Sequence, residues 1–191
     1  MPRLFTGLEV PAQLRTFLSL KQAGLPKVRW IEAEDFHLTL RFIGDVSPQQ
    51  ADDIVEALSA RQWLTPTIEL AELDCFGGER PTAIYASVRN NQPLNDLASA
   101  QDRLLQRLGF APDSRRFTPH VTIGRCKGVS SQAVAHYLSM QGAAMPGQAF
   151  QPTRFVLYSA RASRGGGPYK IEQTFPLNCP EAEFEEEYSY G

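Results

Sequence analysis

Cysteine, histidine and long apolar runs are all scarce in this chain of 191 residues. Its three cysteines, Cys75, Cys126 and Cys179, lie far apart and match neither a zinc-binding spacing nor a disulfide framework. No run approaches 18 consecutive apolar residues, and no apolar leader precedes the first strand-like stretch, Leu4–Val10. These absences predict a protein of the reducing cytoplasm that has no membrane partner.

The formal net charge of −2 is unevenly distributed along the chain. Five glutamates and no lysine or arginine lie in residues 180–191, so the preceding part has a small positive excess. This balance excludes the basic stripe of a duplex-binding protein and suits a small or single-stranded ligand that carries phosphate. We expect residues 1–178 to form a single bilobal domain and residues 179–191 to form an acidic, disordered tail.

One tetrapeptide pattern occurs twice, as His37-Leu38-Thr39-Leu40 and as His120-Val121-Thr122-Ile123, and the two copies start 83 residues apart. Each copy alternates a polar with a branched apolar residue, which is typical of a strand with one buried and one open face. The histidine and the threonine of each copy are therefore expected on the same face. One copy could arise by chance, but two copies in a chain with three histidines indicate a paired site.

Helical and strand patterns alternate around these two copies. Helices are expected over residues 11–21, 47–60, 94–108 and 130–138, with Ser47 and Gln50 as a capping box on the second. Strands are expected at residues 4–10, 28–30, 36–43, 67–73, 83–88, around His120, and at 153–158 and 169–175. The many adjacent strands predict an α+β fold with antiparallel sheets. Comparable positions of the two motifs in residues 1–90 and 91–178 predict a pseudo-twofold arrangement with both histidines in one cleft.

Two facing histidines, each accompanied by a hydroxyl group, suit phosphoryl transfer. The ordinary histidine pKa near 6.5 allows one neutral ring to accept a proton from water while a protonated ring donates one to a departing alkoxide. Thr39 and Thr122 can donate hydrogen bonds to non-bridging phosphate oxygens. Neither motif has a neighbouring carboxylate, histidine or cysteine at a spacing that would complete a metal site, so no metal or other cofactor is expected.

Residues near the motifs leave alternatives open. Strict alternation puts Arg125 on the opposite face from His120, so contact with a phosphate requires a bulge or a twist. Arg41 has the parity of His37 and Thr39 but could equally lie at the outer end of its strand. The aromatic residues around the motifs could stack on a base, although core packing is the simpler interpretation of each; they are Phe5, Phe42, Phe117 and Tyr158.

The chain resembles the 2H phosphoesterase superfamily, and within it the RNA 2′,3′-cyclic phosphodiesterases, also called 2′-5′ RNA ligase-like proteins. The resemblance rests on residues 37–44, HLTLRFIG, and residues 116–123, RFTPHVTI, and it extends to about residue 178. It implies a bilobal fold in which two antiparallel sheets flank a central cleft and the helices lie outside. It also implies metal-independent opening of RNA 2′,3′-cyclic phosphates to 2′-phosphomonoesters, and ligation of RNA ends through a 2′-5′ linkage.

By the same resemblance, His37 is the general acid, His120 is the general base, and Thr39 and Thr122 hold the phosphate. Arg125 is a further candidate for substrate binding. The acid and base roles could be exchanged, because the sequence does not give the orientation of the substrate. We expect a monomer that acts on RNA ends. The alternatives are an enzyme for a small cyclic nucleotide or a nucleotide-sugar cyclic phosphate, and a non-catalytic module that binds RNA ends.

Overall fold

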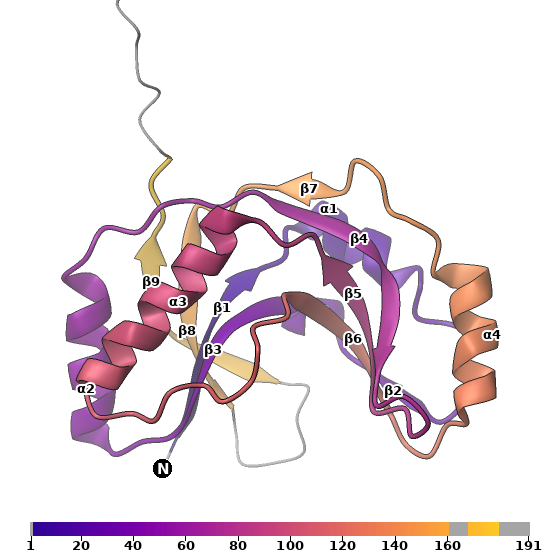
Figure 1. Cartoon of the computed structure of the whole chain (residues 1–191), viewed down its shortest axis with the longest axis horizontal. Helices are drawn as coiled ribbons and strands as arrows, with labels where there is room; N and C mark the ends of the chain where they lie inside the picture. The colour runs from indigo at the N-terminus through magenta and orange to yellow at the C-terminus, as the bar shows by residue number, and fades with distance from the viewer. Residues whose placement is uncertain (1, 161–167, 180–191) are drawn as a thin grey trace, which may run out of the picture.

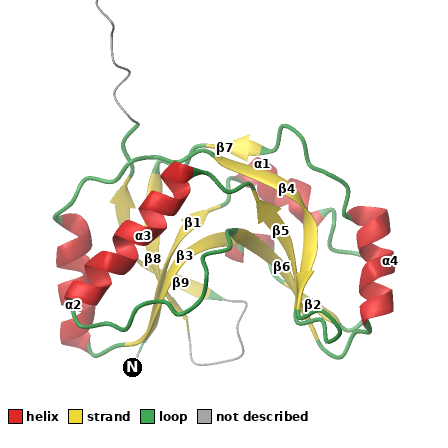
Figure 2. Cartoon of the chain, in the orientation of Figure 1, coloured by secondary structure: helices red, strands yellow, loops and turns green. Residues whose placement is uncertain are grey.

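The computed structural model describes residues 2–160 and 168–179. The chain folds into an arched antiparallel sheet with helices on its outside (Figures 1 and 2). The path of hydrogen-bonded strands is β7-β4-β5-β6-β3-β1-β8-β9, and β2 pairs with β6 beside this path. The predicted α+β class is confirmed. The two expected sheets are the two halves of one continuous sheet.

The halves meet between β3 (His37–Asp45) and β6 (His120–Cys126), the two motif strands. One residue pair, Leu38 with Val121, joins them. The first lobe consists of β1 (Arg3–Glu9), β3, β8 (Arg154–Ala160) and β9 (Tyr169–Pro176). The second lobe consists of β2 (Val28–Trp30), β4 (Ile68–Phe76), β5 (Ala83–Val88), β6 and β7 (Ala149–Phe150). The short strand β7 was not expected from the sequence.

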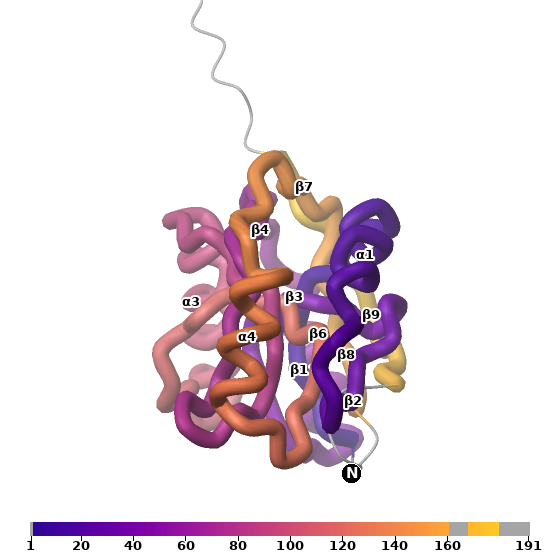
Figure 3. The backbone as a smooth tube through the Cα atoms, turned by 90° about the vertical axis from the view of Figure 1, so that its right-hand side faces the viewer, coloured from indigo at the N-terminus to yellow at the C-terminus, as the bar shows by residue number. Residues whose placement is uncertain are grey.

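The helices divide between the two lobes. On the first lobe, α3 (Gln92–Arg107) packs on β3, and α2 (Pro48–Ser59) packs on α3. On the second lie α1 (Ala12–Ser19) and α4 (Ser131–Gln141) (Figure 3). The Tyr137 hydroxyl of α4 donates a 2.5 Å hydrogen bond to the backbone oxygen of Lys21, just beyond the end of α1. A short 3-10 helix, η1 (Ala33–Asp35), precedes β3. The chain therefore crosses repeatedly between the lobes, and the lobes are not its two sequence halves.

Local sequence determines where the helices begin. The predicted capping box of α2 is confirmed, since the Ser47 hydroxyl accepts from the Gln50 amide and the Gln50 side chain accepts from the Ser47 amide. Asn91 and Ser130 cap α3 and α4 in the same way, each accepting from the backbone amide three residues later.

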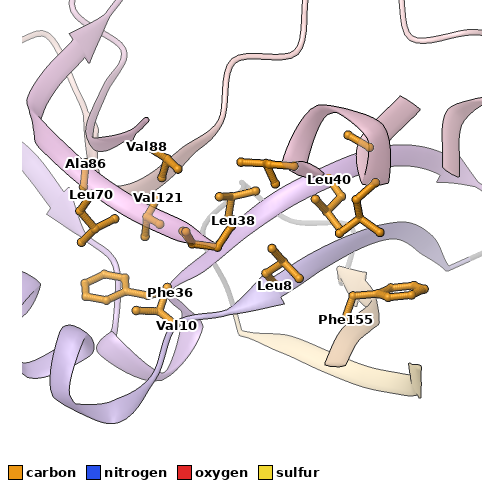
Figure 4. Close-up of a cluster of buried hydrophobic side chains, with 14 of the residues drawn as sticks. Leu8, Val10, Phe36, Leu38, Leu40, Leu70, Ala86, Val88, Val121 and Phe155 are labelled. Atoms are coloured by element: carbon orange, nitrogen blue, oxygen red, sulfur yellow. The ribbon is translucent and has the colours of Figure 1, made fainter. Parts of the chain in front are cut away.

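A hydrophobic core runs beneath both motif strands and fixes which of their faces is open. Leu38 and Val121 are fully buried at its centre, with Leu8 and Phe155 on the neighbouring strands of the first lobe and Ala86 on the second (Figure 4). Because side chains alternate along a strand, burial of Leu38 and Val121 turns the residues on either side of them to the other face.

The expected acidic tail falls outside the described residues from position 180 onward. In the described part of the chain, no helix combines the length and the apolar character needed to cross a membrane.

Candidate active site

The two motifs begin the two central strands and open onto one cavity. The pairing of Leu38 with Val121 in antiparallel register sets His37 level with Thr122 and Thr39 level with His120. All four side chains are half-buried and line a cavity of about 1020 Å³. The structure thus brings together the four motif residues that the sequence singled out.

The two histidine rings are held by equivalent hydrogen bonds. Nδ1 of His37 lies 2.8 Å from the backbone oxygen of Asp35, and Nδ1 of His120 lies 2.7 Å from that of Thr118. A carbonyl oxygen can only accept, so Nδ1 carries the proton in both rings. Each neutral ring therefore has an unprotonated Nε2, the nitrogen that can accept a proton from a ligand.

Aromatic rings enclose each histidine. Phe5 and Tyr169 lie 5.0 and 4.9 Å from the His37 ring, measured between centroids. On the other lobe, Phe76 contacts His120 edge-on at 4.8 Å, and Tyr85 lies 5.3 Å away. The rings fix the imidazoles sterically and exclude water from their sides. Sequence reasoning missed Phe76 and Tyr85, since both lie on strands far from the motif in sequence.

Burial lowers the pKa of both histidines below the ordinary value. The pKa of His37 falls to about 4, mainly through desolvation and further through the charges of His120 and Arg125, while its bond to Asp35 opposes the shift. The pKa of His120 is lowered by burial and by Arg125, against the bond to Thr118. In the ligand-free cleft both rings are therefore mainly neutral at pH 7.

The threonine hydroxyls are available to a ligand. In residues 2–160 and 168–179, neither the Thr39 nor the Thr122 hydroxyl has a hydrogen-bond partner, although both side chains line the cavity. A half-buried hydroxyl without a protein partner gains a bond when a phosphate oxygen reaches it.

Arg125 lies on the cavity side because β6 contains a bulge. In the pairing with β5, Ile84 is opposite Gly124 and Tyr85 is opposite Thr122, which leaves Ile123 as an extra residue. The bulge reverses the alternation, so Arg125 lines the cavity with His120 and Thr122. Its Nε atom is buried and has no hydrogen-bond partner among the described residues.

Arg41 has a different position from its motif neighbours. The pairing of β1 with β3 is irregular between Arg41 and Thr39, so Leu40 is the extra residue there. The shift turns Arg41 toward α3, where it is 7% exposed and pairs with Asp102 at 2.6 Å. The parity that the sequence suggested for Arg41 is therefore wrong, and Phe42, which is 49% exposed, takes the open face.

A glycine on β1 allows the close approach of that strand to the first motif. A Cβ atom on Gly7 would lie 2.9 Å from the Leu38 oxygen and 3.5 Å from the His37 ring, so β1 can approach the first motif only through glycine. No group of three or more histidine, cysteine, aspartate or glutamate residues that could hold a metal ion occurs in the described ranges.

Known proteins share this sequence and this fold. The family model described as the 2′-5′ RNA ligase superfamily matches residues 12–164. Proteins named RNA 2′,3′-cyclic phosphodiesterase are similar: one from Aeropyrum pernix is 37% identical over 112 residues (58% of this chain and 63% of that protein), and one from Aquifex aeolicus is 26% identical over 174 residues (88% and 90%). A third, from Geobacillus stearothermophilus, is 32% identical over 61% of this chain, and the match spans 38% of its length.

Solved structures show the same architecture. E. coli LigT in complex with 3′-AMP superposes with a TM-score of 0.75 at 22% identity and covers 93% of this chain and 99% of LigT. TT0787 of Thermus thermophilus gives a TM-score of 0.78 at 20% identity, covering 93% and 98% of the two chains. At this identity the likeness establishes the fold. With the family match over residues 12–164, it shows that the chain belongs to the 2′-5′ RNA ligase superfamily, with the 2H phosphoesterase fold that the two tetrapeptides predict.

Proposed function

We propose that this protein hydrolyses RNA 2′,3′-cyclic phosphate ends to 2′-phosphomonoesters by acid–base catalysis between His37 and His120. The observation that carries the proposal is the pair of imidazoles, each oriented by the same Nδ1–H bond to the backbone and each lining one cavity. The relatives named RNA 2′,3′-cyclic phosphodiesterase support the substrate class, although the matches span less than two thirds of the length of the Aeropyrum and Geobacillus proteins.

In the proposed reaction, His120 accepts a proton from the water that attacks phosphorus. The bond between phosphorus and O3′ breaks, and His37 donates its proton to O3′. The phosphate remains on O2′, and the proton returns from His120 to His37 through solvent. Thr39, Thr122 and Arg125 would hold the non-bridging oxygens, where negative charge accumulates.

The lowered pKa values bear on which histidine is the acid. A cyclic phosphate brings one negative charge into the cleft, which raises the pKa of both rings and allows one of them to be protonated. The larger shift belongs to His37, so in the free cleft a proton resides preferentially on His120. This observation favours the exchanged assignment, with His120 as acid, as the second candidate.

The same geometry accommodates ligation. A 5′-hydroxyl of a second RNA in place of the attacking water would attack phosphorus, expel O3′ and leave a 2′-5′ linkage. One chain supplies both histidines, so we propose that the domain of residues 1–178 acts as a monomer. The unpaired thiols of Cys75, Cys126 and Cys179 suit a reducing compartment, and we propose the cytoplasm.

The test is hydrolysis of an RNA oligonucleotide ending in a 2′,3′-cyclic phosphate, in the presence of EDTA, with the position of the product phosphate identified. A 2′-phosphate is expected. A 3′-phosphate would mean that O2′ leaves and would overturn the proposed regiochemistry, and loss of turnover in EDTA would overturn metal independence. Binding of the cyclic-ended RNA without turnover would indicate the non-catalytic module, and turnover of small cyclic nucleotides alone would indicate the other substrate class.

A further inference from the structure

The cavity extends well beyond the two histidines. Its volume of about 1020 Å³ lies at the upper end of the roughly 300–1,000 Å³ that small-molecule sites occupy. Its further lining residues come from the end of β3, from α3 and from the connection that leads from α3 to β6. Figure 1 shows the course of this helix and of the connection. We call this part of the cavity the α3 arm, and its lining residues are Phe42, Ser99, Asp102, Arg103, Asp113, Arg115, Arg116 and Phe117.

Positive charge dominates the α3 arm. Arg103, Arg115 and Arg116 are exposed, and none of their guanidinium groups forms an ion pair with a residue that the structure describes. Of the two carboxylates, that of Asp102 is paired with Arg41, and that of Asp113 accepts a 3.1 Å hydrogen bond from the Arg115 amide. Three unpaired arginines facing one hollow are suited to a phosphate group.

The connection that carries Arg115 and Arg116 is fixed at both ends. At the α3 end, Asp102 accepts a hydrogen bond from the Asp113 amide at 3.2 Å, and Arg41 donates to the backbone oxygen of Ala111. At the β6 end, the Thr118 hydroxyl donates to the Arg116 backbone oxygen, and the Thr118 backbone oxygen accepts from His120. The two arginines are thus held beside the reacting centre.

An exposed aromatic ring lies where the α3 arm meets the catalytic part of the cavity. Phe42 is 49% exposed, and its centroid lies 5.7 Å from that of Phe5, which in turn contacts His37. An open aromatic face next to a basic groove is the combination by which proteins bind single-stranded nucleic acid, through stacking of bases and pairing with the backbone.

We propose that the α3 arm binds the nucleotide that precedes the cyclic end of a single-stranded RNA. Arg115 and Arg116, with Arg103 opposite, would contact the phosphodiester, and Phe42 would stack on a base. The inference rests on the proposed function, because a 2′,3′-cyclic phosphate occupies the 3′ end and the strand can continue only in the 5′ direction. The α3 arm thereby makes the protein an enzyme for RNA ends in preference to cyclic mononucleotides.

The test compares kcat/KM for a cyclic-ended trinucleotide with kcat/KM for the cyclic mononucleotide of the same terminal base. The wild type is expected to prefer the trinucleotide, and the Arg115→Ala/Arg116→Ala variant to lose about 10- to 100-fold of that ratio. The salt dependence of trinucleotide turnover should become shallower, by about 0.7 in the log–log slope for each phosphate that the variant no longer neutralises. The matched control is Arg107→Ala/Lys127→Ala, which removes two exposed cations outside the cavity and should leave ratio and slope unchanged.

A second substrate isolates the phosphodiester. The comparison substrate is a trinucleotide with an uncharged methylphosphonate next to the cyclic end. For the wild type, kcat/KM should be lower with this substrate than with the charged trinucleotide, by the same factor as the double substitution causes. For the variant, the two trinucleotides should give the same kcat/KM. Phe42→Ala should weaken trinucleotide turnover and Phe42→Tyr should restore it, since either aromatic ring can stack.

Two results would overturn the inference while the proposed function stands. One is a wild type without preference for the trinucleotide, and the other is an equal loss on both substrates in the Arg115/Arg116 variant. If neither substrate is turned over, the proposed function fails. The role of the α3 arm is then tested separately, by measuring the binding of a fluorescein-labelled trinucleotide. Equal affinity of wild type and variant in fluorescence anisotropy would then overturn the α3 arm, and weaker binding by the variant would support it.

Discussion

Arg41 of the first motif strand, which is buried, and Asp102 of α3, which is half-buried, form an ion pair with a distance of 2.6 Å from Nε to Oδ1. Asp102 also accepts from the amide of Asp113 and from the side chain of Gln106, and these bonds and the cation hold its pKa below the usual range although burial opposes this. The pair therefore joins the motif strand, the helix and the connection to the second motif at one point.

Asp102→Ala should destabilise the protein by about 1–4 kcal/mol, because it leaves the buried Arg41 cation without a charged partner, with only the backbone oxygens of Phe42 and Ala111 to accept from it. Chemical denaturation measures the loss, and limited proteolysis should show faster cleavage in residues 108–118. Asp45→Ala is the control, since its pair with Arg3 is exposed on both sides and should contribute little to stability. Equal effects of the two substitutions would contradict the structural role of the Arg41–Asp102 pair.

His37→Ala and His120→Ala should each lower kcat for cyclic-ended RNA by at least about 100-fold, the size of a lost general acid or base. Circular dichroism should show that both variants remain folded. His136→Ala provides the control, because His136 is exposed on α4 and outside the cavity. Wild-type rates in either motif variant would remove the acid–base mechanism.

Thr39→Ala and Thr122→Ala should each cost about 10- to 1000-fold in kcat, by analogy with the loss of one hydrogen-bond donor to developing charge. Substrate affinity should change less, because the bonds strengthen as charge accumulates on the phosphate. Thr174→Ala on the exposed side of β9 is the comparison. An effect confined to KM would mean that the hydroxyls bind the substrate without stabilising its transition state.

The dependence of kcat/KM on pH should reflect the lowered pKa values of the free site. The reaction needs one protonated and one neutral ring, and this form is most abundant between the two pKa values, from about 4 for His37 to a value below 6.5 for His120. We therefore expect kcat/KM to be highest in mildly acidic buffer and to fall as pH rises above 6.5. An optimum above pH 7.5 would show that the rings are not desolvated as described.

Folding stability should also depend on His37 at acidic pH. Its pKa is lower in the folded than in the unfolded state, so between pH 6.5 and about 4 the unfolded chain binds more protons, and stability falls as pH falls. The shift corresponds to about 3 kcal/mol at most. Urea titrations of wild type and His37→Asn at pH 7 and pH 4.5 should show a smaller loss in the variant, with His136→Asn as control. Parallel losses in wild type and His37→Asn would refute the shift.

The two tetrapeptides by themselves determined which four polar residues line the common cavity and which of their neighbours are buried. Alternation along a strand is a local property, so it could place Leu38 and Val121 in the core and His37 with Thr39, and His120 with Thr122, on the open face. Helix starts were equally local, as the Ser47 capping box shows.

Tertiary structure decided what depends on register between distant strands. The bulges at Leu40 and Ile123 arise where neighbouring strands pair out of step. They turn Arg41 toward Asp102 of α3 and Arg125 to the side of His120 and Thr122, against the alternation that the sequence predicts. The aromatic walls around the histidines and the lowered pKa values depend on burial by Phe5, Phe76 and Tyr85, which only folding brings together. Periodicity acts over neighbouring residues, whereas pairing register and desolvation depend on contacts between strands far apart in the chain.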